Sequence, residues 1–245
     1  MPAESRDVSQ SVVAITGASS GIGGATARLL VESGARVAVQ ARRVERLSSL
    51  IDELGDKDVL AVPGDVMKPS SADHLVDAAV AQYGQLDSIV INAGIGMYGG
   101  ILDADDDELR TMMRTNVEGT VWAVRSAVRQ FRKQGTGGDV VIIASVAGQR
   151  GGGNEAVYAA TKFAQVGLAG SLDREVQKEG IRVSTICPAG VHTEFAIGAG
   201  RTEGDPSLDD FLQPADVGEA VLTVLRQPRR MRTTVWSMFS MSEGS

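Results

Sequence analysis

The stretch at residues 16–30, "TGASSGIGGATARLL", decides how the chain folds, because it joins an apolar run at 11–16 to a helical pattern that ends at Gly34. Glycines allow a sharp backbone turn and a close approach to a ligand. The N-terminus of the following helix supplies free N–H groups and a partial positive charge. The stretch therefore predicts a cradle for a pyrophosphate at the end of the first strand. Because similar glycine turns also occur in structural roles, the loop alone does not establish a function.

Six more short apolar runs follow the loop, and their apolar residues are continuous instead of alternating. Continuous runs are typical of strands in a parallel sheet that helices cover on both faces. Helical patterns lie between the runs, and this alternation predicts an α/β fold with right-handed crossovers. The further strands are expected at 35–40, 58–65, 88–94, 139–145, 182–188 and 233–238, and the helices at 23–34, 42–55, 71–84, 105–133 and 155–179.

The length of 245 residues and the hydrophobic fraction of 43% suit one α/β domain that spans residues 1–245. The segment at about 194–213 is less regular than the rest. We expect it to be a substrate-loop excursion within the domain, because irregular segments often carry function. Two descriptions of it stay open: a mobile loop with a short helix, or a plain surface excursion.

Composition excludes several classes of protein. The net charge of −7 argues against a nucleic-acid-binding protein, which needs a basic surface. The single cysteine, Cys187, rules out an internal disulfide framework and favours a reducing compartment. No stretch is as long and apolar as a membrane span, and the first ten residues lack the order of a signal peptide, so we expect a soluble cytoplasmic protein. No cluster of His, Cys and Asp has the spacing of metal ligands, and no metal is expected.

Tyr158 and Lys162 stand four residues apart in "EAVYAATKFAQ" at 155–165, so a helix would place both on one face. A tyrosine has a pKa of about 10, and a nearby positive charge lowers it. Lys162 can supply that charge, and a tyrosine so tuned can donate a proton to a carbonyl oxygen and take it back. Ser145 ends the fifth expected strand, where its hydroxyl could reach the same oxygen. Taken alone, Tyr158 and Lys162 could also be two ordinary helix residues.

Several motifs resemble those of the short-chain dehydrogenase/reductase family. The loop at 16–23 resembles T-G-x-x-x-G-I-G, and "INAG" at 91–94 resembles N-N-A-G, with Ile91 in place of the first Asn. The segment 187–193, "CPAGVHT", resembles P-G-x-V-x-T with Ala189 inserted, or a P-x-G-x-x-T form. The match runs along about 11–195. It implies a Rossmann-like, doubly wound sheet of seven parallel strands with helices on both faces, and nicotinamide-dependent oxidoreduction.

The resemblance also implies roles for individual residues. Ser145 holds the carbonyl oxygen, and Tyr158 exchanges the proton. Lys162 holds the nicotinamide ribose and tunes Tyr158, while Asn116 holds a water that links Lys162 to solvent. The cofactor-binding residues that it implies are Gly17, Ser19, Ser20, Gly21, Ile22, Gly23, Arg42, Arg43, Asp65, Val66, Asn92, Ala93, Gly94, Tyr158, Lys162, Pro188, Gly190, Val191 and Thr193.

The end of the second strand favours NADP over NAD as the cofactor. An acidic residue at this place would bind the 2′-hydroxyl of NAD, but Gln40 and Ala41 are followed by Arg42 and Arg43. Arginine pairs with a phosphate through charge-assisted hydrogen bonds. The resemblance places Arg42 on the 2′-phosphate, with Arg43 nearby and Ser19 as a candidate partner. The alternative is that "RRVER" is a solvated helix start.

The leading hypothesis is NADPH-dependent reduction of a ketone or an aldehyde to an alcohol. One alternative is an alcohol or hydroxy-acid dehydrogenase that works oxidatively, because the same residues serve both directions. Another is a non-catalytic protein that senses NADP(H), although a sensor would not need Ser145, Tyr158 and Lys162.

The substrate is not specified by the sequence. We expect the segments 95–102, 146–154 and 194–213 to select this small molecule. The family pairs the two long helices with their copies in another subunit, which implies a homodimer or a homotetramer.

Overall fold

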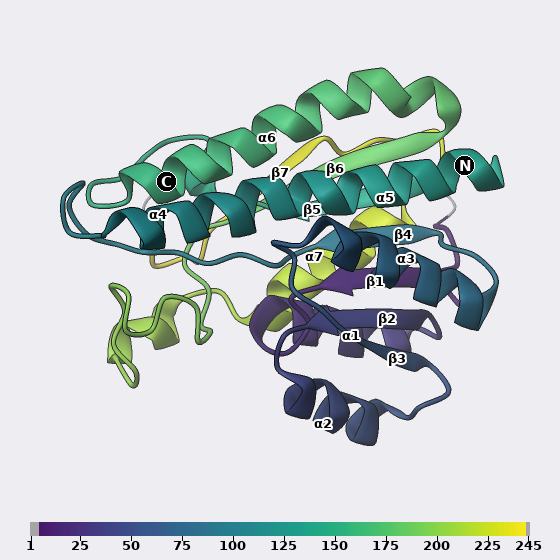
Figure 1. Cartoon of the computed structure of the whole chain (residues 1–245), viewed down its shortest axis with the longest axis horizontal. Coiled ribbons are helices and arrows are strands. Elements are labelled where there is room, and N and C mark those ends of the chain that lie inside the picture. Colours follow the sequence, from purple (N-terminus) through teal and green to yellow (C-terminus); the bar gives the residue numbers. More distant parts are fainter. Residues whose placement is uncertain (1–4, 244–245) are drawn as a thin grey trace.

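Seven parallel strands form the centre of the molecule (Figure 1). The computed structural model describes residues 5–243. In space the strands follow the order β3-β2-β1-β4-β5-β6-β7, so the chain reverses its direction of travel across the sheet beside β1. Ligands of such sheets bind at this reversal, outside the carboxyl ends of the strands. The strands are β1 Val12–Thr16, β2 Arg36–Ala41, β3 Val59–Pro63, β4 Ser88–Ile91, β5 Gly138–Ile143, β6 Ile181–Pro188 and β7 Val235–Met238.

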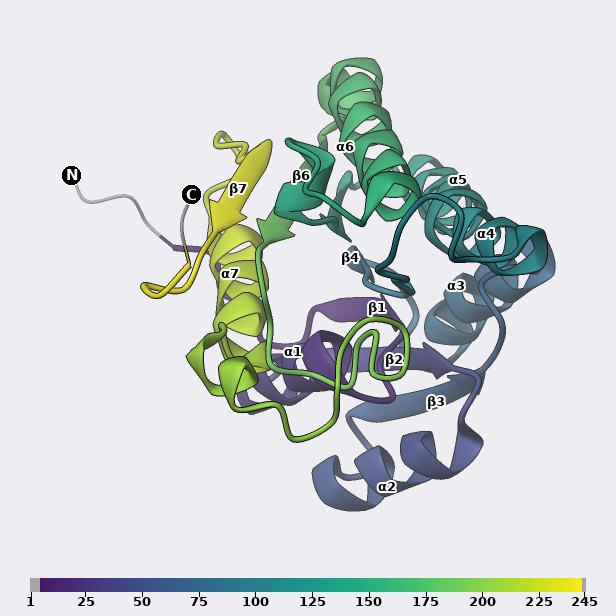
Figure 2. The same cartoon turned by 90° about the vertical axis from the view of Figure 1, so that its left-hand side faces the viewer.

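Helices cover both faces of the sheet, as the view in Figure 2 shows. Alternate residues of β1 belong to different cores: Val13 and Ile15 pack with α1, α2 and α7, whereas Val12 and Ala14 pack with α3, α5 and α6. The predicted Rossmann-like fold is therefore confirmed. The helices are α1 Gly21–Glu32, α2 Val44–Leu54, α3 Pro69–Tyr83, α4 Asp106–Met113, α5 Gly119–Gln134, α6 Ala156–Val176 and α7 Pro214–Arg226.

The helix expected at 105–133 is formed, but it contains a wide turn that the sequence did not predict. Residues Arg114–Glu118 adopt π-helical geometry between α4 and α5. The helix begins with a capping box, in which Asp105 and Glu108 exchange hydrogen bonds with each other's backbone. Single π turns within helices are often found at functional sites. Asn116 lies inside this one and is fully buried.

The segment 194–213, called the excursion below, leaves the carboxyl end of the sheet and returns to α7 (Figures 1 and 2). It contains one short 3₁₀ helix, Pro206–Asp210. Its base is held by backbone hydrogen bonds: His192 donates to the carbonyl of Leu212 at 2.8 Å, and Leu212 donates to that of Gly190 at 3.1 Å. The two ends of the excursion therefore lie side by side at the edge of the sheet.

Candidate active site

The carboxyl ends of the strands open into a cavity of about 1050 Å³, called the cleft below. The excursion forms one of its walls. Two predicted site residues, Gly23 and Asn116, are not in its lining and lie behind it. The predicted residues that line it are Gly17, Ser19, Ser20, Gly21, Ile22, Arg42, Arg43, Asp65, Val66, Asn92, Ala93, Gly94, Ser145, Tyr158, Lys162, Pro188, Gly190, Val191 and Thr193.

The glycine loop presents an uncapped helix end to the cleft. Ser20 is the N-cap of α1, yet its side chain makes no capping hydrogen bond, and the first turn holds no acidic residue. Gly23 lies behind the loop, where a Cβ atom would come within 2.5 Å of Asn92 Nδ2 and of the carbonyl oxygen of Gly17. Gly23 thus lets α1 pack against the loop. The N–H groups at the start of α1 remain available to an anion.

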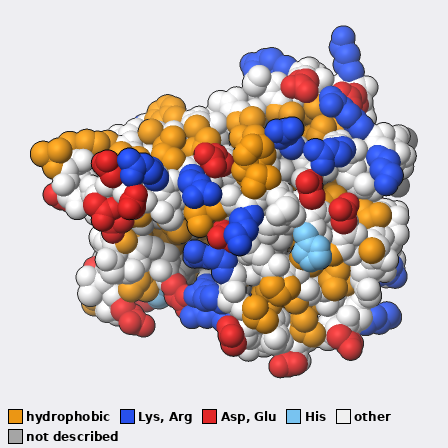
Figure 3. Space-filling model, in the orientation of Figure 1, with side chains coloured by type: hydrophobic (Ala, Val, Ile, Leu, Met, Phe, Trp, Pro, Cys, Tyr) orange, Lys and Arg blue, Asp and Glu red, His pale blue; other side chains and the backbone are white. Residues whose placement is uncertain are grey.

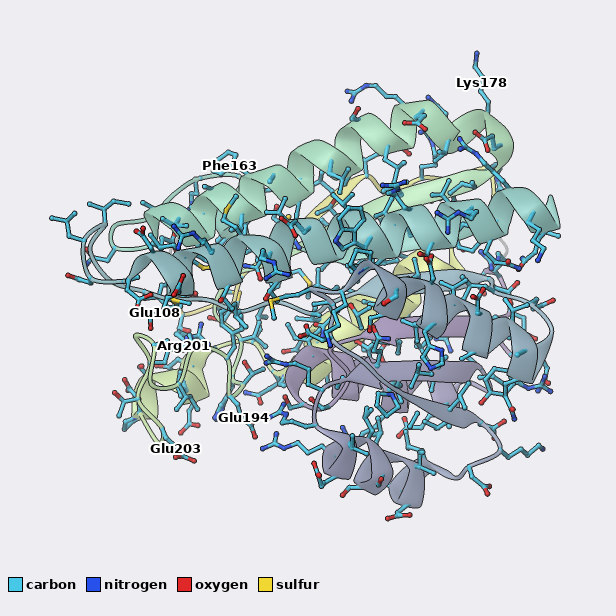
Figure 4. The ribbon with its side chains drawn as sticks, in the orientation of Figure 1. Glu108, Phe163, Lys178, Glu194, Arg201 and Glu203 are labelled. Carbon is cyan, nitrogen blue, oxygen red and sulfur yellow. The ribbon has the colours of Figure 1, made fainter. Side chains whose placement is uncertain are left out.

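Basic side chains surround the same loop. The Arg43 guanidinium donates to Ser19 Oγ at 2.9 Å and to Ser20 Oγ at 2.7 Å. Arg43 and Arg46 also pair with Glu194 of the excursion, at 3.2 and 2.7 Å. Figure 3 shows basic side chains beside acidic ones where the excursion meets the α2 side of the molecule, and Figure 4 labels Glu194 there. This bridge of Glu194 to two arginines ties the excursion to the start of α2.

Arg46 and Glu194 were not predicted as site residues. Glu194 lies 148 positions after Arg46 and 151 positions after Arg43 in the chain. In the sequence, Arg46 is one more polar residue of an amphipathic helix. No local pattern could therefore have shown that Glu194 meets these arginines.

The segments that follow β3 and β4 also line the cleft. Asp65 accepts a hydrogen bond from the backbone of Met67 at 3.0 Å, and Val66 lies against Gly119 of α5, where a Cβ would come within 3.1 Å of it. Asn92 Nδ2 donates to the carbonyl of Gly17 at 3.0 Å. Asn92 thus fixes the glycine loop in addition to lining the cleft.

Ser145, Tyr158 and Lys162 meet at the inner end of the cleft, as the sequence predicted for one face of a helix and the end of a strand. Their exposed fractions are 8, 5 and 4%. Lys162 Nζ lies 5.7 Å from the centre of the Tyr158 ring. The same ring is flanked by Tyr98 and Phe195, with centroid distances of 5.6 and 5.8 Å. A hydroxyl, a phenol and an ammonium therefore share one pocket that is largely shielded from solvent.

Burial controls the acid–base properties of this group. It raises the pKa of the Tyr158 phenol, the neighbouring Tyr98 raises it further, and a contact with the Ser145 hydroxyl opposes the rise. Burial also lowers the pKa of Lys162 to about 8. Lys162 alone therefore does not make the phenol acidic. The tuning of Tyr158 by Lys162, which the resemblance implied, stays a prediction.

Two buried acceptors hold the Lys162 ammonium. Lys162 Nζ donates to the carbonyl of Ile143 at 3.1 Å and to Gln165 Oε1 at 2.9 Å. Gln165 Nε2 in turn donates to the carbonyl of Asn116 at 2.9 Å. The Gln165 amide thus joins the Lys162 ammonium to the backbone of Asn116, and the water that the resemblance places at Asn116 stays a prediction. The sequence analysis missed Gln165, although an amide three residues after Lys162 in a helix of small and apolar residues was a visible signal.

Three aromatic rings and one arginine form the outer part of the pocket. The Arg201 guanidinium lies 5.9 Å from the ring centres of Tyr98 and Phe195, and 5.3 Å from that of Phe211. Arg201 also donates to the carbonyl of Val191 at 3.0 Å. Figure 4 shows it on the excursion, on the side that faces α4. Residues of all three segments expected to select the substrate line the cleft.

Comparison with known protein families identifies the family of this chain. The family described as "short chain dehydrogenase" matches residues 11–204. The chain belongs to the short-chain dehydrogenase/reductase family. Enzymes of this family are oxidoreductases that act on alcohol or carbonyl groups, and so does this one.

Relatives of known sequence or structure cover nearly the whole chain. An uncharacterised oxidoreductase of Staphylococcus aureus is 33% identical over 90% of this chain and 93% of its own. An alcohol dehydrogenase of Thermococcus sibiricus, complexed with 5-hydroxy-NADP, has a TM-score of 0.87 at 27% identity, with 96% of this chain and 98% of that chain covered. A 3-ketoacyl-(acyl-carrier-protein) reductase of Brucella melitensis, complexed with NADH, has a TM-score of 0.86 at 28% identity, with 95 and 98% covered.

The cleft of this short-chain dehydrogenase/reductase fits a nicotinamide dinucleotide. The uncapped start of α1 suits the pyrophosphate, and the cavity runs from there to Tyr158. Two further observations concern residues 5–243 only: no group of three or more His, Cys, Asp or Glu side chains is placed to hold a metal, and no helix is long and apolar enough to cross a membrane.

Proposed function

We propose that this protein is an NADPH-dependent reductase that converts a ketone or an aldehyde to an alcohol, in a reversible reaction. The observation that carries the proposal is the meeting of Ser145, Tyr158 and Lys162 at the inner end of a cleft whose outer end is an anion cradle. The two solved relatives named above support it, because alcohol dehydrogenases and ketoacyl reductases both act at a carbon that carries a single oxygen.

NADP(H) is the proposed cofactor because the cradle is basic where the 2′-phosphate would lie. The tip of β2 carries no carboxylate for a ribose hydroxyl. Arg42, which the resemblance places on the 2′-phosphate, lines this part of the cleft. Arg43 donates to the hydroxyls of Ser19 and Ser20 beside it, so we propose Arg43 as a further phosphate contact. When bound, the nicotinamide supplies the hydride.

The side chains of the pocket can do the rest of the chemistry. Ser145 Oγ donates a hydrogen bond to the carbonyl oxygen and stabilises the negative charge that develops there. Tyr158 transfers its phenolic proton to that oxygen, so that hydride on carbon and proton on oxygen complete the alcohol. Lys162 has three N–H donors, of which two are engaged with Ile143 and Gln165. The third is free to hold a ribose hydroxyl in the cleft.

The raised pKa of Tyr158 suits the proton-donor role that reduction requires, although the same residues serve both directions. A phenol that burial keeps protonated is ready to donate a proton, whereas an oxidation needs the phenolate as the base. The proposal of a non-catalytic sensor gains no support, because a sensor does not need a buried Ser145–Tyr158–Lys162 group.

The proposal is tested by following NADPH oxidation at the nicotinamide absorbance against a panel of ketones and aldehydes. We expect turnover with at least one class of carbonyl compound, and much weaker turnover with NADH. Tight NADPH binding with no turnover across the panel would instead support the sensor.

We also propose a cytoplasmic homo-oligomer. Cys187 is a buried free thiol, as a reducing compartment allows, and the family resemblance implies pairing of the two long helices with a second copy.

A further inference from the structure

Gln165 is a buried amide between the Lys162 ammonium and the π turn. It is 1% exposed. Its Oε1 accepts from Lys162 Nζ at 2.9 Å, and its Nε2 donates to the carbonyl of Asn116 at 2.9 Å and to Thr120 Oγ1 at 2.8 Å. One side chain of α6 thus joins the Lys162 ammonium to the π turn and to α5.

The orientation of this amide follows from its partners. An ammonium has only donors, so the atom of Gln165 that faces Lys162 must be the oxygen. The nitrogen then faces two acceptors, the carbonyl of Asn116 and the hydroxyl of Thr120. The Thr120 hydroxyl donates to the carbonyl of Asn116 at 2.7 Å, which leaves its oxygen free to accept from Gln165. All donors and acceptors in this group are paired consistently.

The carbonyl of Asn116 has no room for a further donor. A carbonyl oxygen has two lone pairs, and Thr120 and Gln165 each donate to it. The Asn116 side chain is also engaged, with the backbone of Ile95 on both sides and with Thr161. A water bound to this carbonyl, as the family resemblance implied, would have to displace the Gln165 amide.

We propose that Gln165 positions the Lys162 ammonium and closes the path by which a proton would pass between Lys162 and Asn116. A neutral amide neither gains nor loses a proton at ordinary pH, so it does not relay one. The proton that Tyr158 gives up is then replaced from the open side of the cleft. The inference rests on the proposed function only in the purpose that it gives to Lys162, and both parts can be tested without turnover.

The positioning role is tested through the titration of Lys162. The titratable groups that face its ammonium are the Tyr158 phenol on α6 and the Cys187 thiol on β6, whereas β5 and the π turn contribute only the neutral groups of Ile143 and Asn116. Lys162 is observed by ¹⁵N NMR of its ammonium in the protein without nucleotide or substrate. Lys162→Met identifies the signal.

Three variants separate positioning from packing. Gln165→Leu removes an acceptor from the buried ammonium, so its titration midpoint should fall, by about one pH unit. Gln165→Glu puts a carboxylate in contact with it, and the midpoint should rise by about one unit or more. Thr120→Val is the matched control: it removes the same network's hydroxyl without touching Lys162, and the midpoint should stay in place. If both Gln165 variants fold and titrate like the parent protein, the positioning role is wrong.

The closed path is tested by hydrogen exchange of the Gln165 side-chain amide. If water does not reach it, its N–H protons should exchange at least a hundredfold more slowly than those of an exposed side-chain amide. Gln177, exposed at the end of α6, is the internal reference. Exchange of Gln165 as fast as that of Gln177 would overturn the closed path. Absence of turnover with every carbonyl compound would reject the proposed function and leave both results intact.

Discussion

Tyr158, the proposed proton donor, lies in surroundings that oppose its ionisation. Its ring packs between Tyr98 and Phe195, and only its hydroxyl has a chemical task. The ring and the hydroxyl are therefore separable by mutation, because phenylalanine keeps the first and removes the second. Substitutions of Tyr158, Lys162 and Arg43 each test one such role.

Tyr158→Phe should lower the rate of NADPH oxidation by about two to four orders of magnitude, the range lost with a general acid. The melting temperature and the affinity for NADPH should stay close to those of the parent protein, because the ring contacts are kept. Stopped-flow turnover, calorimetry and fluorescence titration check the three quantities. Near-normal turnover would remove Tyr158 from the mechanism.

Lys162→Met should change how stability depends on pH. Folding lowers the pKa of Lys162 from 10.5 to about 8, so below pH 8 both states hold the proton and the folded state carries the full cost of a buried ammonium. Between pH 8 and 10.5 the unfolded chain binds more protons, and the contribution of Lys162 to stability rises with pH. At about 1.4 kcal/mol per pKa unit, the parent protein should gain about 3 kcal/mol over the variant across this window.

Urea unfolding of both proteins at pH 7 and at pH 10 measures that difference. The comparison between the two pH values cancels the packing change that methionine introduces. A difference between the two proteins that does not vary with pH would show that Lys162 titrates normally in the folded state.

Arg43→Ala should weaken NADPH binding about tenfold to a hundredfold, since hydrogen bonds between charged groups contribute about 1.5–3 kcal/mol. Binding of NADH should change little. Arg46→Ala is the matched control, because Arg46 shares the partner Glu194 but has no contact with Ser19 or Ser20. Equal losses for NADPH and NADH in Arg43→Ala would mean that Arg43 does not read the 2′-phosphate.

The sequence predicted the site where chemistry depends on short spacings. Tyr158 and Lys162 share a helix face because four residues make about one turn, and Ser145 follows a strand that ends at the same edge of the sheet. Contacts between distant segments were not predictable, because nothing local marks them. Three such contacts depend on how the elements pack: the ion pair of Glu194 with Arg43, the hydrogen bond of Gln165 with Asn116, and the contacts of Arg201 with three rings.

At the level of elements, the excursion depends on a few fastening contacts. Arg201 joins it to Tyr98 of the β4 side and to Phe195 and Phe211 of its own ends. The tip, which includes the exposed Glu203, projects away from these contacts (Figure 4). The excursion is thus fastened near the pocket and loosely held at its tip.

Arg201→Ala should loosen the excursion more than it destabilises the fold. A cation over an aromatic ring contributes about 0.5–1 kcal/mol at an accessible site, so the loss of three such contacts should raise KM about tenfold and speed limited proteolysis within the excursion. Arg201→Lys keeps the charge and should lie between the two. Unchanged proteolysis and KM in Arg201→Ala would show that the backbone contacts at the base suffice.

Two elements escaped the sequence analysis for physical reasons. α7 begins at Pro214 after Gln213, which takes the capping position usually held by Ser, Thr, Asp or Asn, and no glycine marks its end. The π turn at Arg114–Glu118 differs from an α-helix only in hydrogen-bond spacing, which leaves no trace in composition. The seven strands were found because a sheet buried on both faces needs unbroken apolar runs.

For the whole molecule, the strand order explains why one cleft collects so many segments. The reversal beside β1 leaves a gap between the connections above β1 and β4, and residues from distant parts of the chain converge there. The outer faces of α5 and α6 remain on the surface. Phe163 on α6 is 46% exposed and points outward (Figure 4).

Light scattering should give a mass of two or four times the chain mass of 25.6 kDa. The family resemblance pairs the two long helices with their copies, and Phe163 is a large apolar side chain that α6 exposes, so Phe163→Glu should shift the mass towards the single chain. Lys178→Glu, a charge change near the far end of α6, is the control and should leave the mass unchanged. A mass of one chain for the parent protein at micromolar concentration would reject the oligomer.

The bridge of Glu194 to Arg43 and Arg46 has a kinetic consequence. Glu194 is the chain neighbour of Phe195, whose ring packs against Tyr158, so one peptide unit ties the outer mouth to the reacting end. If the proposed nucleotide draws Arg43 away from Glu194, the pair of Glu194 with Arg46 still holds the wall beside Tyr158. We therefore expect the nucleotide to bind before the carbonyl compound, because it is the partner that changes how this wall is held.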